Sequence, residues 1–92
     1  MFQVHFYRTP SGDTPAYDWL KSLPPQAESK ARARLKMLAE YGDKLRRPYV
    51  DYLRNGIYEL RWECLHVQYR FLYFFTGTRI IIVSHGLKKR GV

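Results

Sequence analysis

The chain has 92 residues and a formal net charge of +8 at neutral pH. These 92 residues allow one domain, expected to span residues 1–92, and little else. The positive charge favours an anionic partner, either a nucleic acid or an acidic protein.

The first half of the chain predicts one strand and two helices. Residues 2–8 alternate apolar and polar side chains with the period of a half-buried strand. Thr14 is expected to cap a short helix that has Pro15 at its first position and ends before Pro24. A longer helix is expected to start at Pro24, with Pro25 in its first turn, and to stop at Gly42. Its apolar residues recur at spacings of three or four: Ala27, Ala31, Leu35, Leu38 and Tyr41.

The longer helix also has a basic face, which contains Lys30, Arg32, Arg34 and Lys36. One interpretation is a solvated surface supported by an ion pair between Glu28 and Arg32. The other is a surface that contacts nucleic-acid phosphates. The sequence leaves both open.

After a polar connection over residues 43–55, three further strands are predicted at 57–63, 67–75 and 79–85. Their connections are so short that only antiparallel pairing is practical. The predicted fold class is therefore α+β: an N-terminal strand, two helices, and then a three-stranded antiparallel meander with the helices on one face of the sheet.

The pairing register can also be predicted. If Leu65 and His66 form the tip of the first hairpin, Arg61 lies directly opposite Arg70. A second turn at Thr76 and Gly77 would pair Arg70 with Val83 and place His85 on the same face as the arginines. The opposite face would then be aromatic and would pack on the helices.

Two facing arginines inside a sheet need an explanation, because like charges so placed repel. Either Glu59 or Glu63 neutralises them, or they are arranged to hold a phosphate group. The second interpretation is favoured by the C-terminal third of the chain, in which no Asp or Glu follows Glu63 and His85 precedes a run of basic residues, Lys88, Lys89 and Arg90.

Metal and cofactor sites are not predicted. Three scattered histidines and one cysteine lack the spacing of a ligand cluster, and there is no glycine-rich phosphate loop. The single Cys64 cannot form an internal disulfide, which fits a reducing compartment, and we expect it to be inert. Without a signal peptide or an apolar run of roughly 20 residues, we expect a cytoplasmic protein that does not enter the membrane.

The segment from Leu53 to Lys89 resembles the toxins of the RelE/ParE superfamily, and more narrowly the HigB-like, phage-derived branch of type II toxin–antitoxin modules. The resemblance rests on Gly-Ile-Tyr-Glu-Leu-Arg at residues 56–61, Tyr-Arg-Phe-Leu-Tyr at 69–73 and His-Gly-Leu-Lys-Lys at 85–89. The upstream order of strand, short helix and long helix also matches. Such toxins usually continue beyond the two lysines with another basic helical segment, whereas this chain stops at Val92.

The resemblance implies an endoribonuclease that cuts mRNA, in many relatives on the translating ribosome, without a metal. Arg61 and Arg70 would stabilise the charge on phosphorus, and His85 would transfer a proton unless it is only bonded to backbone. Lys88 would hold the RNA or serve as a base. The residues expected to bind the RNA backbone are Lys89, Arg90, Arg79, Lys30 and Arg34.

Two other functions remain open at this stage. ParE-like members poison DNA gyrase and do not cut RNA, and a basic RNA-binding domain without catalysis would share the same charge.

The arginine face is also expected to expose Ile57, Leu72, Phe74, Ile81 and Val83, which is much apolar surface for a free monomer. The resemblance implies that a small antitoxin protein covers it. Whether the chain also forms a homodimer is left open.

Overall fold

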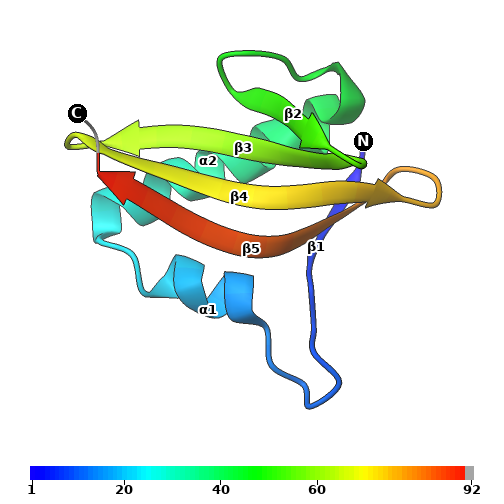
Figure 1. The fold of residues 1–92 in the computed structure, drawn as a ribbon, viewed down its shortest axis with the longest axis horizontal. Coiled ribbons are helices and arrows are strands. Elements are labelled where there is room, and N and C mark those ends of the chain that lie inside the picture. Colours follow the sequence, from blue (N-terminus) through cyan, green and yellow to red (C-terminus); the bar gives the residue numbers. More distant parts are fainter. Residues whose placement is uncertain (91–92) are drawn as a thin grey trace.

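The structure, a computed structural model, describes residues 1–90, with the side chain of Arg90 excepted. Two helices cover one side of a five-stranded mixed sheet (Figure 1). In chain order the elements are β1 (Gln3–Phe6), α1 (Pro15–Lys21), α2 (Pro25–Tyr41), a short 3₁₀ turn (Gly42–Lys44), β2 (Val50–Arg54), β3 (Ile57–Cys64), β4 (Val67–Thr76) and β5 (Ile80–Arg90). Neither described helix is long and apolar enough to cross a bilayer.

The sheet is larger than the predicted meander. Its strand order is β1-β5-β4-β3-β2, with β1 parallel to β5 and every other pair antiparallel. The predicted three strands form its centre, and the prediction was wrong about strand count and order because β2 and β1 extend it on both sides. In Figure 1, β1 runs beside the start of β5, while β2 lies on the other border beside β3.

Strand β2 occupies the segment that we expected to be a polar connection. It forms a hairpin with β3 in which Arg54 pairs with Ile57, leaving Asn55 and Gly56 as a two-residue loop. Both loop residues have positive φ, at 52° and 78°. Asn-Gly is the strongest short-range hairpin signal, because this turn requires left-handed backbone at both positions. That signal was present in the sequence.

The helices supply the core as the apolar spacing predicts. Ala27, Ala31 and Leu38 of α2 are buried against the sheet, together with Leu20 of α1. Two details differ from expectation. Tyr41 is half exposed because α2 ends there and turns at Gly42, and the side chain of Thr14 makes no capping hydrogen bond.

The hairpin of β3 and β4 has the predicted register. Arg61 lies opposite Arg70, and Leu65 and His66 form the tip with positive φ angles of 51° and 67°. The helix-covered face of this hairpin is aromatic, and Trp62 stacks on its cross-strand partner Tyr69 with an interplanar angle of 11°.

The second hairpin differs from the predicted register. Its turn lies at residues 77–79, so Arg70 pairs with Leu87 and not with Val83. A bulge between Leu72 and Tyr73 shifts the pairing by one residue on β5. The changed turn position pairs Ile81 with Phe75 and Val83 with Tyr73 on the helix-covered face, so both are fully buried in the core, and the prediction that they extend the apolar arginine face was wrong. The bulge acts beyond them and sets His85 opposite Leu72.

A close approach between α1 and β5 fixes the end of the sheet that carries the basic residues. The Trp19 ring lies so near the backbone of Gly86 that a Cβ at that position would collide with it. Trp19 also packs edge-on against Phe71 at 5.3 Å between ring centroids. Because Gly86 has no side chain, the Trp19 ring of α1 can pack directly on the backbone of β5 at the residue between His85 and Leu87.

Replacing Gly86 with Ala should destabilise the fold by about 1–3 kcal/mol, because the added methyl group overpacks a closed contact. Urea unfolding measures this free energy. Trp19→Ala should cost stability on its own, but the double variant should lose less than the sum of the two single losses, because the collision no longer exists. Strictly additive losses would contradict this contact.

Candidate functional site

The face of the sheet opposite the helices, here called the open face, arranges its polar side chains in three cross-strand rows. Paired residues share a face, so the rows follow directly from the register. The first row is Asp51, Glu59, Leu72 and His85; the second is Arg61, Arg70 and Leu87; the third is Glu63, Gln68 and Lys89. The two arginines thus lie at the centre of a charged surface.

Glu59 lies between the two arginines and contacts both. Its Oε1 is 3.5 Å from Arg61 Nε and 3.4 Å from Arg70 Nη1, which also donates to its Oε2 at 3.5 Å. Glu59 is only 6% exposed, whereas the side chains of Arg61 and Arg70 are 36% and 24% exposed. The carboxylate therefore holds the guanidinium groups from beneath and leaves their outer sides accessible to solvent.

The arginine pair can therefore be partly neutralised by Glu59 and still be free to hold a phosphate group. One carboxylate cannot neutralise two guanidinium groups, and Asp51, which is 4.0 Å from Arg61, is also bound by Arg47 at 3.0 Å. Arg70 has a further partner, since its Nη2 donates to Gln68 Oε1 at 3.2 Å. The pair is oriented by Glu59 and retains positive charge toward solvent.

A cavity of about 250 Å³ lies beside the arginine pair. Its lining contains three arginines, Arg34, Arg61 and Arg70, but a single carboxylate, that of Glu63. The other lining residues are Pro48, Tyr49, Trp62, Gln68 and Tyr69. A cavity with this charge balance suits an anion attached to an organic group.

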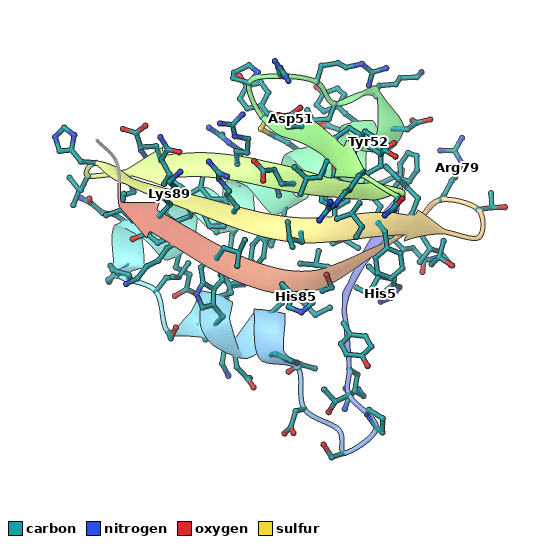
Figure 2. All side chains as sticks on the ribbon, in the orientation of Figure 1. His5, Asp51, Tyr52, Arg79, His85 and Lys89 are labelled. Carbon is teal, nitrogen blue, oxygen red and sulfur yellow. The ribbon has the colours of Figure 1, made fainter. Side chains whose placement is uncertain are left out.

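Two side chains of β5 flank Arg70 diagonally. His85 and Lys89 lie two positions to either side of Leu87, the direct partner of Arg70, so each is about 7–8 Å from it along the sheet. His85 is exposed and its Nδ1 is 3.0 Å from Ser84 Oγ. Figure 2 shows His85 in the middle of β5 and Lys89 near its end.

Not every residue predicted for the site lies there. Lys88 pairs with the buried Tyr69, which places it on the helix-covered face, away from Arg70. Arg79 lies in the β4–β5 turn at the far end of the sheet from Lys89, with its guanidinium 5.5 Å from the centroid of the Phe2 ring (Figure 2). The side chain of Arg90 lies outside the described residues.

Lys30 and Arg34 of α2 reach the part of the β3 edge that β2 does not cover, past the pair of Val50 and Leu60. Lys30 Nζ donates to the Glu63 carbonyl at 3.1 Å, and Arg34 Nε donates to the Arg61 carbonyl at 3.3 Å. The two side chains thus donate hydrogen bonds to backbone carbonyls that have no neighbouring strand to bind them. Arg34 also joins the cavity, whereas Lys36 and Arg32 remain on the exposed side of the helix.

Sequence reasoning missed Tyr49 and Gln68 as site residues, and it weighed Glu59 only as a neutralising partner. Tyr49 reaches the site because its carbonyl accepts a hydrogen bond from Arg61 N at 2.8 Å, which extends the pairing of β2 with β3. The Asn55-Gly56 turn could have revealed this strand. Tyr69 and Tyr73 are core residues of the aromatic face that was predicted to pack on the helices, and burial raises the pKa of the Tyr73 hydroxyl.

Among residues 1–90 no group of three or more His, Cys, Asp or Glu side chains has the geometry to hold a metal ion. The chemistry that the site itself offers is electrostatic: guanidinium groups fixed on a rigid sheet, one exposed imidazole, and a donor-rich cavity. Such groups can hold a phosphodiester and stabilise added charge on it.

Comparison with protein families matches residues 18–91 to the family described as "Phage derived protein Gp49-like (DUF891)". The match begins within α1 and includes all of the site rows. Comparison with curated proteins gave no significant match. Since the family match extends over well more than half of the chain, the protein belongs to the Gp49-like phage-derived family, which is known as a toxin-type module.

Proposed function

We propose that this protein is the toxin of a type II toxin–antitoxin module, of the RelE/ParE type and HigB-like, and that it is a metal-independent mRNA endoribonuclease that acts on the translating ribosome. The family match supports the toxin role. The observation that supports the nuclease is the arginine pair, which shares one buried glutamate beside a cavity lined by three arginines.

The reaction that suits these groups is transfer of the phosphodiester to the neighbouring 2′-hydroxyl. The hydroxyl loses its proton, its oxygen bonds to phosphorus, and the bond from phosphorus to the 5′-oxygen breaks. That oxygen takes up a proton, which leaves a 2′,3′-cyclic phosphate and a free 5′-hydroxyl. Arg61 and Arg70 hold the non-bridging oxygens, whose charge grows in the transition state.

His85 is the proton-transfer group in this proposal. It is exposed on the open face, diagonal to Arg70, and is therefore within reach of a phosphodiester held by that arginine. Lys89 binds the adjacent backbone phosphate from the other side of Leu87. Lys88, on the opposite face, has no part in this chemistry.

The antitoxin is proposed to be a small acidic protein that covers the open face. Leu87 and Ile57 on that face are 46% and 38% exposed, and Leu87 lies directly beside Arg70. A bound antitoxin that contacts Leu87 would also block the arginines. The antitoxin would then inhibit RNA cleavage simply by occupying the open face.

His85→Ala should reduce RNA cleavage about 10²-fold or more, because a positioned acid or base contributes at least that much. The measurement is mapping of RNA 5′-ends with 5′-hydroxyl termini after a pulse of expression, together with cleavage by purified protein on ribosomes. His5→Ala is the matched control, since His5 is also exposed on the open face but lies on the edge strand β1.

Two outcomes would contradict the proposal. Unchanged cleavage by His85→Ala would remove His85 from the mechanism. Growth arrest without new RNA ends, accompanied by inhibition of gyrase supercoiling in vitro, would show a ParE-like protein instead.

A further inference from the structure

The cavity contains groups that the phosphate chemistry does not use. Arg34 and Tyr49 form one wall, with the Arg34 guanidinium carbon 4.8 Å from the centroid of the Tyr49 ring. The guanidinium is held flat from two sides, since Arg34 Nε donates to the Arg61 carbonyl at 3.3 Å and Nη1 lies 3.8 Å from Met37 Sδ. A fixed guanidinium plane backed by an aromatic ring is a surface on which a nucleobase stacks.

The third row of the open face supplies a second wall. Glu63 and Gln68 are direct cross-strand partners, so their side chains project together beside the arginine pair. Gln68 Oε1 already accepts a hydrogen bond from Arg70 Nη2, which leaves its amide nitrogen as a donor toward the cavity. The Glu63 carboxylate has no ion-pair partner among the described residues and offers two acceptor oxygens.

A donor next to a two-oxygen acceptor matches one base edge in particular. Guanine presents O6, N1–H and N2–H side by side, which is an acceptor followed by two donors. Adenine presents a donor followed by an acceptor and no second donor. Cytosine and uracil offer less stacking area and lack two adjacent donors.

We propose that this cavity is a nucleobase site that selects guanine in the RNA next to the phosphate held by Arg61 and Arg70. The base stacks on Arg34, O6 accepts from the Gln68 amide, and N1–H and N2–H donate to Glu63. This inference rests on the proposed function for its substrate, RNA, but it concerns a binding preference that can be measured without cleavage.

The test uses fluorescein-labelled hexanucleotides with 2′-O-methyl riboses, which cannot be cut by the proposed mechanism. Each is a uridine strand with one central guanine, adenine or hypoxanthine base, and dissociation constants are measured by anisotropy at one fixed salt concentration. The guanine strand should bind about tenfold more tightly than the adenine strand, within the range expected for one well-matched base contact. The hypoxanthine strand, which lacks the 2-amino group, should fall between them.

Glu63→Gln should collapse the preference for guanine over hypoxanthine, because one acceptor oxygen becomes a donor. Removing a negative charge from this surface also strengthens binding to every strand, so the ratio of affinities is the informative quantity. Glu40→Gln is the matched control, since Glu40 lines a different cavity with Arg79 at the far end of the sheet. It should leave the ratio unchanged.

The outcomes separate this site from the nuclease. RNA cleavage with no preference for guanine, in either cutting or binding, would overturn the base site while the nuclease stands. Guanine-selective binding that depends on Glu63, without cleavage, would support the site and refute the nuclease. Equal affinities for all strands, or no measurable binding at low salt, would overturn the inference.

Discussion

Arg70→Ala should abolish growth inhibition and reduce RNA cleavage about 10²–10³-fold, the loss expected when one preorganised charge-stabilising donor is removed. Arg70 is on the central strand β4, its side chain is 24% exposed, and its guanidinium is held by both Glu59 and Gln68. It is therefore the better fixed of the two arginines. The measurements are colony formation under induced expression and mapping of RNA ends.

The same substitution should leave the protein folded. Removing Arg70 takes away the repulsion with Arg61 and leaves Glu59 in a one-to-one pair, at 3.5 Å from Arg61 Nε. Circular dichroism and urea unfolding would verify this. Arg70→Lys is the matched control: it keeps the charge but loses the two-pronged geometry, so we expect an intermediate loss. Full toxicity of a folded Arg70→Ala variant would refute the catalytic role of this residue.

The sequence predicted the centre of the site because hairpin geometry is local. Two strands joined by Leu65 and His66 leave one register, and that register sets Arg61 opposite Arg70. Burial of the aromatic face then decides which side the arginines occupy. The same local logic would have found β2 through Asn55 and Gly56.

The remaining parts of the site depend on contacts that the local pattern does not contain. The bulge between Leu72 and Tyr73 shifts the pairing of β5 by one residue, which sets His85 opposite Leu72 on the open face. The parallel pairing of β1 with β5 joins residues nearly eighty positions apart. Arg34 meets Tyr49 only because α2 crosses the edge of β3. These arrangements follow from packing across the whole domain and not from spacing along the chain.

Glu59→Gln should destabilise the protein by about 1–3 kcal/mol at low salt. Breaking a buried ion pair by removing one partner costs about 3–5 kcal/mol. The loss here should be smaller, because both arginines remain partly exposed and solvent screens their charges. The amide keeps the shape of the side chain but leaves two guanidinium groups facing each other without a counter-charge. Urea unfolding of both proteins measures the difference.

If this repulsion is the cause, it can be relieved in two independent ways. Adding Arg61→Gln to Glu59→Gln removes one of the two like charges, so the double variant should be more stable than Glu59→Gln alone. Inorganic phosphate should likewise stabilise Glu59→Gln more than it stabilises the wild type, because a phosphate ion between the arginines replaces the missing carboxylate. Sodium chloride at the same ionic strength controls for screening. A Glu59→Gln variant as stable as the wild type, or one that phosphate does not stabilise preferentially, would show that the arginines are not held as an anion-binding pair.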